Sequence, residues 1–144
     1  MPREGPPGRA GHRSVPHTAD LRVEAWGPTR EECLAQAVRG MCESFLDLAG
    51  AVALRTRDVV VRAGTDEDLL VALLEEVVYR LDTDGEIPLD VELTPHGDGL
   101  RAGLRMADAE SLPVTGAVPK AVTLHELDIA GGPRGWTCSV TLDV

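Results

Sequence analysis

The residues best suited to chemistry lie together just before a short alternating segment. His17, Thr18 and Asp20 bring an imidazole, a hydroxyl and a carboxylate within four residues of one another. Residues 21–25 then alternate apolar and charged side chains, which is the period of a half-buried strand. Locally, this is either a polar strand end, with Asp20 exposed or capping a turn, or one side of a functional site.

Two further carboxylates stand at notable positions. Asp47 falls where the first predicted helix runs out, and the negative end of a helix disfavours a carboxylate. It is therefore either solvated or compensated by a cation. Asp143 lies on the polar face of the last predicted strand, one residue before Val144 and its terminal carboxylate. The sequence pattern alone does not show whether these carboxylates lie close together in space.

Other kinds of site lack their motifs. No glycine-rich nucleotide loop and no nucleophile-elbow pattern is present. Ser139 and His125 have no spacing that would distinguish a nucleophile and its base from ordinary strand residues. Residues 82–85 lack the third acidic position and the closing glutamate of an EF-hand loop, so they are interpreted as a turn. The three cysteines form no CxxC pair, which favours buried free thiols in a reducing cytoplasm.

Two helices are predicted to position these groups. Thr29 and Glu32 form a capping box at the start of the first helix, whose apolar stripe continues until the helix runs out at residues 47–50. Thr65 caps a second helix, with acidic residues in its first turn and an apolar stripe that ends at Leu81.

The strands complete the predicted architecture. Alternation and turn signals predict strands at residues 21–25, 57–63, 86–94, 99–106, 118–129 and 135–143. This order of elements predicts one α+β domain over residues 14–144, with an antiparallel or mixed β-sheet and both helices packed on one face. Residues 1–13 are rich in proline and glycine and are expected to form a flexible tail.

Charge and composition narrow the classes of function. The chain has 14 basic and 24 acidic residues, a formal net charge of -10, and its field opposes the binding of nucleic-acid phosphates. Only four aromatic residues are available for stacking on bases. No segment is apolar enough to span a membrane or to serve as a signal peptide, so a cytoplasmic protein is expected. The acidic surface favours metal ions or a basic protein partner.

Several ordered stretches resemble the archease family and together cover nearly everything from Val15 onward. These stretches are His17–Asp20 with the strand and the capped helix that follow it to Asp47, the second helix with its turn over residues 68–85, the segment Lys120–Leu127, and the closing Val140–Val144. The resemblance implies an α+β fold of strand–helix–strand–strand type.

The resemblance also implies a function and a partner. Archeases activate RtcB-type RNA ligases, which join RNA ends with GTP and manganese in tRNA splicing or RNA repair. In that family the accessory protein promotes guanylylation and multiple turnover of the ligase and is not itself an enzyme. The expected partner is therefore such a ligase, with no direct nucleic-acid binding, no membrane and no small-molecule substrate.

Carried over by position, the family's metal site falls on Asp20, Asp47 and Asp143, with a terminal oxygen from Val144. Ligation by oxygen alone suits calcium, manganese or magnesium and disfavours zinc. His17 is expected beside the metal as a supporting residue, and His125 on a strand next to the site, with either one in or out of contact with the ion.

The sequence departs from the family pattern at two places. Leu124 stands where the family commonly has an aromatic residue before the histidine, and the segment between residues 96 and 120 is short and rich in Gly, Ala and Pro. Two other functions stay open: a small metal-dependent hydrolase that uses the same aspartates, and a chaperone-like protein-binding module.

Overall fold

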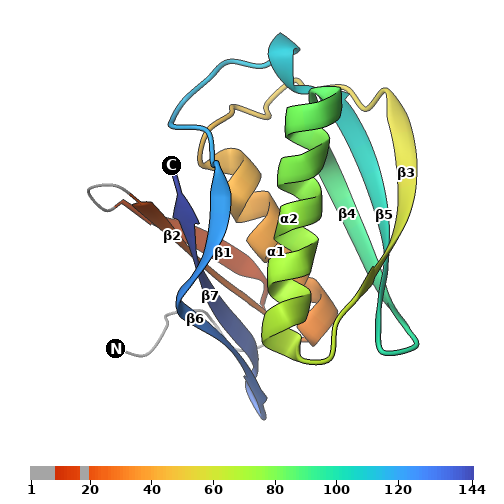
Figure 1. The fold of residues 1–144 in the computed structure, drawn as a ribbon, viewed down its shortest axis with the longest axis vertical. Helices are drawn as coiled ribbons and strands as arrows, with labels where there is room; N and C mark the ends of the chain where they lie inside the picture. The colour runs from red at the N-terminus through yellow and green to blue at the C-terminus, as the bar shows by residue number, and fades with distance from the viewer. Residues whose placement is uncertain (1–8, 17–19) are drawn as a thin grey trace.

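The computed structural model describes residues 9–16 and 20–144, which form two helices, seven strands and one short 3-10 turn (Figure 1). In chain order the elements are β1 (Gly11–Pro16), β2 (Asp20–Gly27), α1 (Arg30–Glu43), β3 (Arg55–Arg62), α2 (Asp66–Asp84), β4 (Glu86–His96), β5 (Gly99–Asp108), η1 (Ala109–Ser111), β6 (Ala121–Gly132) and β7 (Gly135–Asp143). The predicted α+β class is confirmed. The strands divide into two antiparallel sheets, in the orders β1-β2-β7-β6 and β3-β5-β4, instead of forming one.

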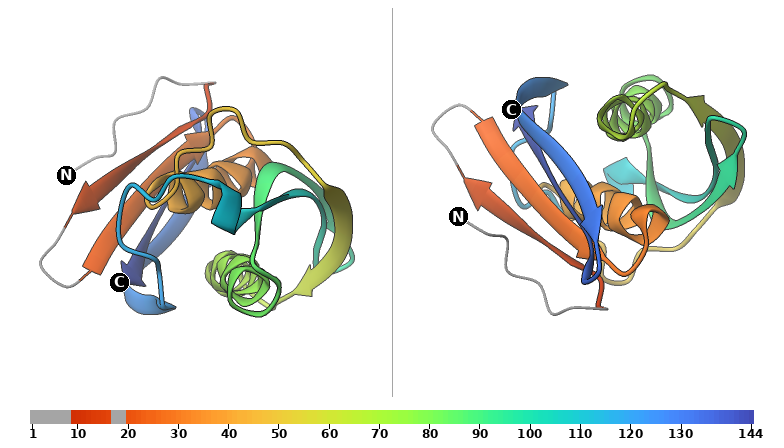
Figure 2. Two further views of the ribbon diagram at one scale, coloured as in Figure 1. Left: turned by 90° about the horizontal axis from the view of Figure 1, so that it is seen from above. Right: turned by 90° about the horizontal axis from the view of Figure 1, so that it is seen from below.

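The helix α1 lies between the two sheets (Figure 2). It buries Leu34, Val38 and Met41 against β2 and β7 on one side and against β4 on the other. A side chain at Gly40 would place its Cβ 2.8 Å from a methyl group of Val23, so this glycine lets α1 approach β2 closely. The core therefore needs two sheets, because α1 is apolar around most of its surface.

Both helices begin at the predicted caps. The Thr29 hydroxyl accepts a hydrogen bond from the Glu32 N–H at 3.1 Å, and the Thr65 hydroxyl accepts one from the Asp68 N–H at the same distance. The second helix continues through residues 82–84, which were predicted to be a turn. It ends at Gly85, whose φ of 67° is the left-handed conformation that closes many helices.

The first helix ends earlier than predicted, at Glu43. The Ser44 hydroxyl donates to the Met41 carbonyl, and the chain beyond it pairs with a distant segment. Leu46 forms a bridge to Val114, and the Asp47 N–H donates to the Pro113 carbonyl at 2.9 Å. Asp47 therefore lies beyond the end of α1, in a loop held by the segment after η1, and not at the end of the helix as predicted.

The strand β1 begins inside the segment predicted to be a tail. Gly11 pairs with Trp26 of β2, and a Cβ at Gly11 would lie 2.6 Å from the indole ring. The His12 ring contacts Gln36 and Glu43 of α1, at 2.8 and 2.6 Å. Residues 11–13 thus belong to the sheet, whereas residues 1–8 lie outside the described part of the chain.

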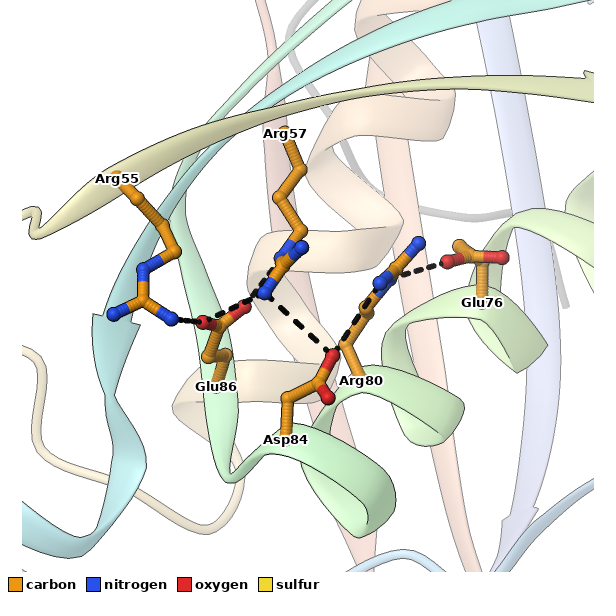
Figure 3. Close-up of polar contacts among 6 residues, drawn as sticks. All are labelled: Arg55, Arg57, Glu76, Arg80, Asp84 and Glu86. Carbon is orange, nitrogen blue, oxygen red and sulfur yellow. Dashed lines mark hydrogen bonds and ion pairs between the residues drawn. The ribbon is translucent and has the colours of Figure 1, made fainter.

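A network of ion pairs joins β3, the C-terminal end of α2 and β4 (Figure 3). Glu86 is buried and accepts hydrogen bonds from Arg55 and Arg57, the latter at 2.6 and 3.1 Å. The Arg57 hydrogen bonds outweigh the burial of the carboxyl group and lower the pKa of Glu86 below its ordinary value. The same network extends to Asp84 through Arg57 and Arg80.

Within the described residues, no helix is long and apolar enough to cross a membrane.

Candidate functional site

The structure pairs two of the predicted metal ligands directly. Asp20, the first residue of β2, lies opposite Asp143, the last residue of β7, at the open end of the four-stranded sheet. Both occupy the face of the sheet that also carries Arg22 and Glu24, away from α1. Side chains directly opposite in an antiparallel pair have Cβ atoms about 4.5–5.5 Å apart, and like charges at such positions repel each other.

Asp47 is the third predicted ligand, and its carboxylate is engaged locally. The Oδ1 atom accepts a hydrogen bond from the Ala49 N–H at 2.9 Å, which forms a tight turn after α1. The side chain is exposed beside an open hollow of about 330 Å³ that Glu43, Leu48 and Thr115 help to line.

One segment connects these carboxylates. The Pro113 carbonyl accepts from the Asp47 N–H, and the Lys120 N–H donates to the Asp143 carbonyl at 2.7 Å. Residues 113–120 therefore run from the loop of Asp47 to the end of β7. Within residues 9–16 and 20–144, however, no group of three or more His, Cys, Asp or Glu side chains is close enough to hold a metal ion.

Lys120 was not among the predicted site residues. Its main chain is bonded to Asp143, and its side chain is exposed. It is also the sole lysine of the chain, since every other basic residue is an arginine. An ammonium group is a compact, flexible charge that arginine does not reproduce, and this departure from the arginine pattern was a visible signal in the sequence.

His125 lies on a bulge of β6. The register of β6 against β7 shifts between Thr123 and Asp128, and Glu126 within the bulge has a φ of 54°, which is uncommon for a residue with a side chain. His125 is 73% exposed as a side chain, and its Nε2 lies 3.7 Å from the Glu126 carboxylate. The structure thus places His125 on the surface of an edge strand. His17 lies outside the described residues.

The remaining predicted site residue and the nearby charges complete the sheet end. Val144 follows Asp143 and is half-buried against the core. Arg22 forms ion pairs with Glu24 at 3.6 Å and with Glu126 of the β6 bulge at 3.5 Å. The face that carries the paired aspartates is therefore charged. At its acidic end Asp143 is exposed and Asp20 is half-buried, and this end could accept a cation.

The fold and this sheet end define a small two-sheet α+β protein with a paired-carboxylate edge. The model of the archease protein family matches residues 12–144, and the chain belongs to that family. A probable protein archease of Mycobacterium tuberculosis is 56% identical over 141 residues, which cover 97% of this chain and 79% of that protein. The protein archease of Archaeoglobus fulgidus is 28% identical over 92% of this chain and 98% of its own length.

Two solved structures share the fold. The solution structure of protein 1598 of Methanobacterium thermoautotrophicum matches with a TM-score of 0.72 and 25% identity, covering 93% of this chain and 99% of that one. A Thermotoga maritima archease, described as a possible chaperone, matches with a TM-score of 0.65 and 20% identity, covering 90% of this chain and 94% of that one. The second likeness concerns the fold alone.

Proposed function

We propose that this protein is a metal-binding accessory protein that activates an RtcB-type GTP-dependent RNA ligase by promoting its guanylylation and multiple turnover. The observation that carries the proposal is the pairing of Asp20 with Asp143 at the open end of the four-stranded sheet. Membership of the archease family supports it, because the resemblance to that family selects Asp20, Asp47 and Asp143 as the expected metal ligands. The protein itself has no catalytic role in this proposal.

The donor chemistry of the sheet end suits a divalent cation. Two opposed carboxylates offer the hard ligands that calcium, manganese and magnesium prefer, and an oxygen of Val144 is a further proposed ligand. Asp47 is the third proposed ligand, although its carboxylate is bonded to the Ala49 N–H in this structure. When bound, the ion would neutralise the repulsion between Asp20 and Asp143.

The residues of the chain itself have separate tasks. The strand pairing fixes Asp20 and Asp143 opposite each other, and the bond from the Lys120 N–H to the Asp143 carbonyl holds the end of β7. The loop at Asp47 is attached to the same connecting segment through Pro113. These bonds hold the proposed ligands on an exposed end of the domain, where a protein partner can reach them.

The test combines metal binding with ligase activation. Calcium or manganese is expected to raise the melting temperature of the wild-type protein, and Asp143→Ala is expected to abolish that shift while the protein stays folded. Asp58→Ala, an exposed carboxylate of the other sheet, serves as the matched control. In a multiple-turnover assay with an RtcB-type ligase, Asp143→Ala should no longer activate the enzyme, whereas Asp58→Ala should.

Four outcomes would contradict the proposal. Full activation by Asp143→Ala would exclude the acidic pair from the function. If metal raised the melting temperature of Asp143→Ala as much as that of the wild type, the metal site would be excluded. Hydrolysis of phosphoesters by the purified protein, lost in Asp20→Ala, would indicate a metal-dependent hydrolase instead. Stabilisation of many unrelated proteins without any effect on the ligase would indicate a general chaperone.

A further inference from the structure

An apolar groove beside the C-terminal half of α2 adjoins the site described above through residues 118–120. It has a volume of about 540 Å³ and lies between α2 and the segment that enters β6. Figure 1 shows the start of β6 running alongside α2, and the two elements are in contact. The lining residues are Val78, Leu81, Asp82, Val118, Pro119 and Lys120.

The floor of this groove is apolar and open to solvent. Val118 is 47% exposed, and Val78 and Leu81 are half-buried where they leave the core. Apolar side chains gathered along a surface groove are a feature of protein-binding surfaces, because contact with a partner removes them from water.

The helix beside the groove is strongly acidic. Residues 66–84 contain seven carboxylates and one basic residue, Arg80, which pairs with Glu76 at 2.7 Å and with Asp84 at 3.3 Å. Glu75 and Asp82 lie two turns apart along the exposed side of α2, and neither has an ion-pair partner in the described part of the chain. A phosphate backbone would be repelled here, whereas arginine and lysine side chains would be attracted.

We infer that this groove binds a basic amphipathic segment of a protein partner. The apolar side chains of that segment occupy the floor at Val78 and Val118, and its basic side chains meet Glu75 and Asp82. The identity of the partner, an RtcB-type ligase, rests on the proposed function. The groove is continuous with the acidic pair through Lys120, which lines the groove and donates its N–H to Asp143.

The first test measures the dissociation constant of the protein for an RtcB-type ligase. Val118→Asp puts a charge into the groove at an exposed position and should raise Kd by about tenfold or more. The control is Val60→Asp, which changes a valine of similar exposure, 40%, on the outer face of the three-stranded sheet. The control should change Kd by less than about twofold, and the melting curves of both variants verify that they are folded.

The second test concerns charge. Glu75→Lys combined with Asp82→Lys should also raise Kd by about tenfold at low salt, and the effect should shrink near about 0.5 M salt because exposed charges are then screened. Asp58→Lys combined with Glu92→Lys changes the net charge equally on the opposite sheet. A similar weakening by this control pair would show that only the overall charge matters, and would overturn the inference.

The results also separate this inference from the proposed function. Groove variants that bind weakly should still activate the ligase at saturating concentration, because Asp20 and Asp143 are intact, whereas Asp143→Ala should bind and fail to activate. Normal binding by both groove variants would overturn the groove as a docking surface and leave the activation proposal standing. Absence of any complex between the wild-type protein and the ligase would overturn both, and so would wild-type binding through RNA alone.

Discussion

The buried carboxylate of Glu86 makes the stability of this protein depend on acid in a predictable direction. Its side chain is 6% exposed and receives hydrogen bonds from Arg55 and Arg57, which connect β4 to β3 (Figure 3). Glu86→Gln keeps the shape of the side chain and removes its charge. One of the two carboxylate oxygens is replaced by an NH2 group, which cannot accept a hydrogen bond from a guanidinium.

The magnitude follows from the burial of the carboxylate and the exposure of its partners. Hydrogen bonds to charged groups contribute about 1.5–3 kcal/mol, but Arg55 is 55% exposed and its interaction is screened by water. We therefore expect Glu86→Gln to lower the free energy of unfolding by about 2 kcal/mol at neutral pH, from the loss of hydrogen bonds to a buried charge. For a domain of this size, that loss corresponds to a melting temperature lower by about 6 °C.

The sign of the pH effect follows from the lowered pKa of Glu86. The group is more acidic in the folded state than in the unfolded chain, where its pKa is near 4.5. Its contribution to stability is therefore complete above that value and is lost as pH falls through the lower, folded-state pKa. Acidification should destabilise the wild type more than Glu86→Gln, so that the two stabilities converge at low pH.

Urea unfolding followed by circular dichroism between pH 7 and pH 3 measures this convergence. Glu92→Gln, an exposed residue of the same strand, is the control and should match the wild type throughout. Equal stability of Glu86→Gln and the wild type at pH 7 would refute the reasoning. A difference that stayed constant down to pH 3 would also refute it, because the effect would then come from packing and not from charge.

Two further predictions concern the core and the charge of the molecule. Leu74 is fully buried in α2, so Leu74→Ala should cost about 2–5 kcal/mol in urea unfolding, whereas Val60→Ala at an exposed position should cost about 1 kcal/mol or less; equal costs would contradict the packing described above. The isolated protein, with a net charge of -10, should not bind single-stranded RNA at physiological salt in a fluorescence anisotropy titration, and tight, salt-sensitive binding would contradict this.

The helices were the most predictable part of the fold because their signals are local. Thr29 and Thr65 cap the helices at the predicted residues, since a hydroxyl followed three residues later by a free N–H needs no distant partner. The predicted end of α1 was wrong because Leu46 and Asp47 pair with residues 113–114, and no local pattern reveals a partner so far along the chain.

In the strands, too, local patterns were predictable and long-range contacts were not. The bounds of β7 were predicted from its alternation, but Ser139 and Thr141 on its polar face are buried, because β7 lies between β2 and β6 in the sheet. The strand β1 was missed because Gly11 and His12 show no apolar alternation. It is held by main-chain pairing with β2 and by the contacts of His12 with α1.

The candidate site depends both on the local sequence and on the tertiary structure. The amino-acid sequence by itself determined the helix caps, the apolar stripes, the α+β class and the resemblance that selected Asp20, Asp47 and Asp143. Only the tertiary structure decided that Asp20 and Asp143 lie opposite each other while Asp47 is bonded within its own loop. The physical reason is that helix signals act over a few residues, whereas antiparallel pairing joins the two ends of the domain through a register that no local pattern contains.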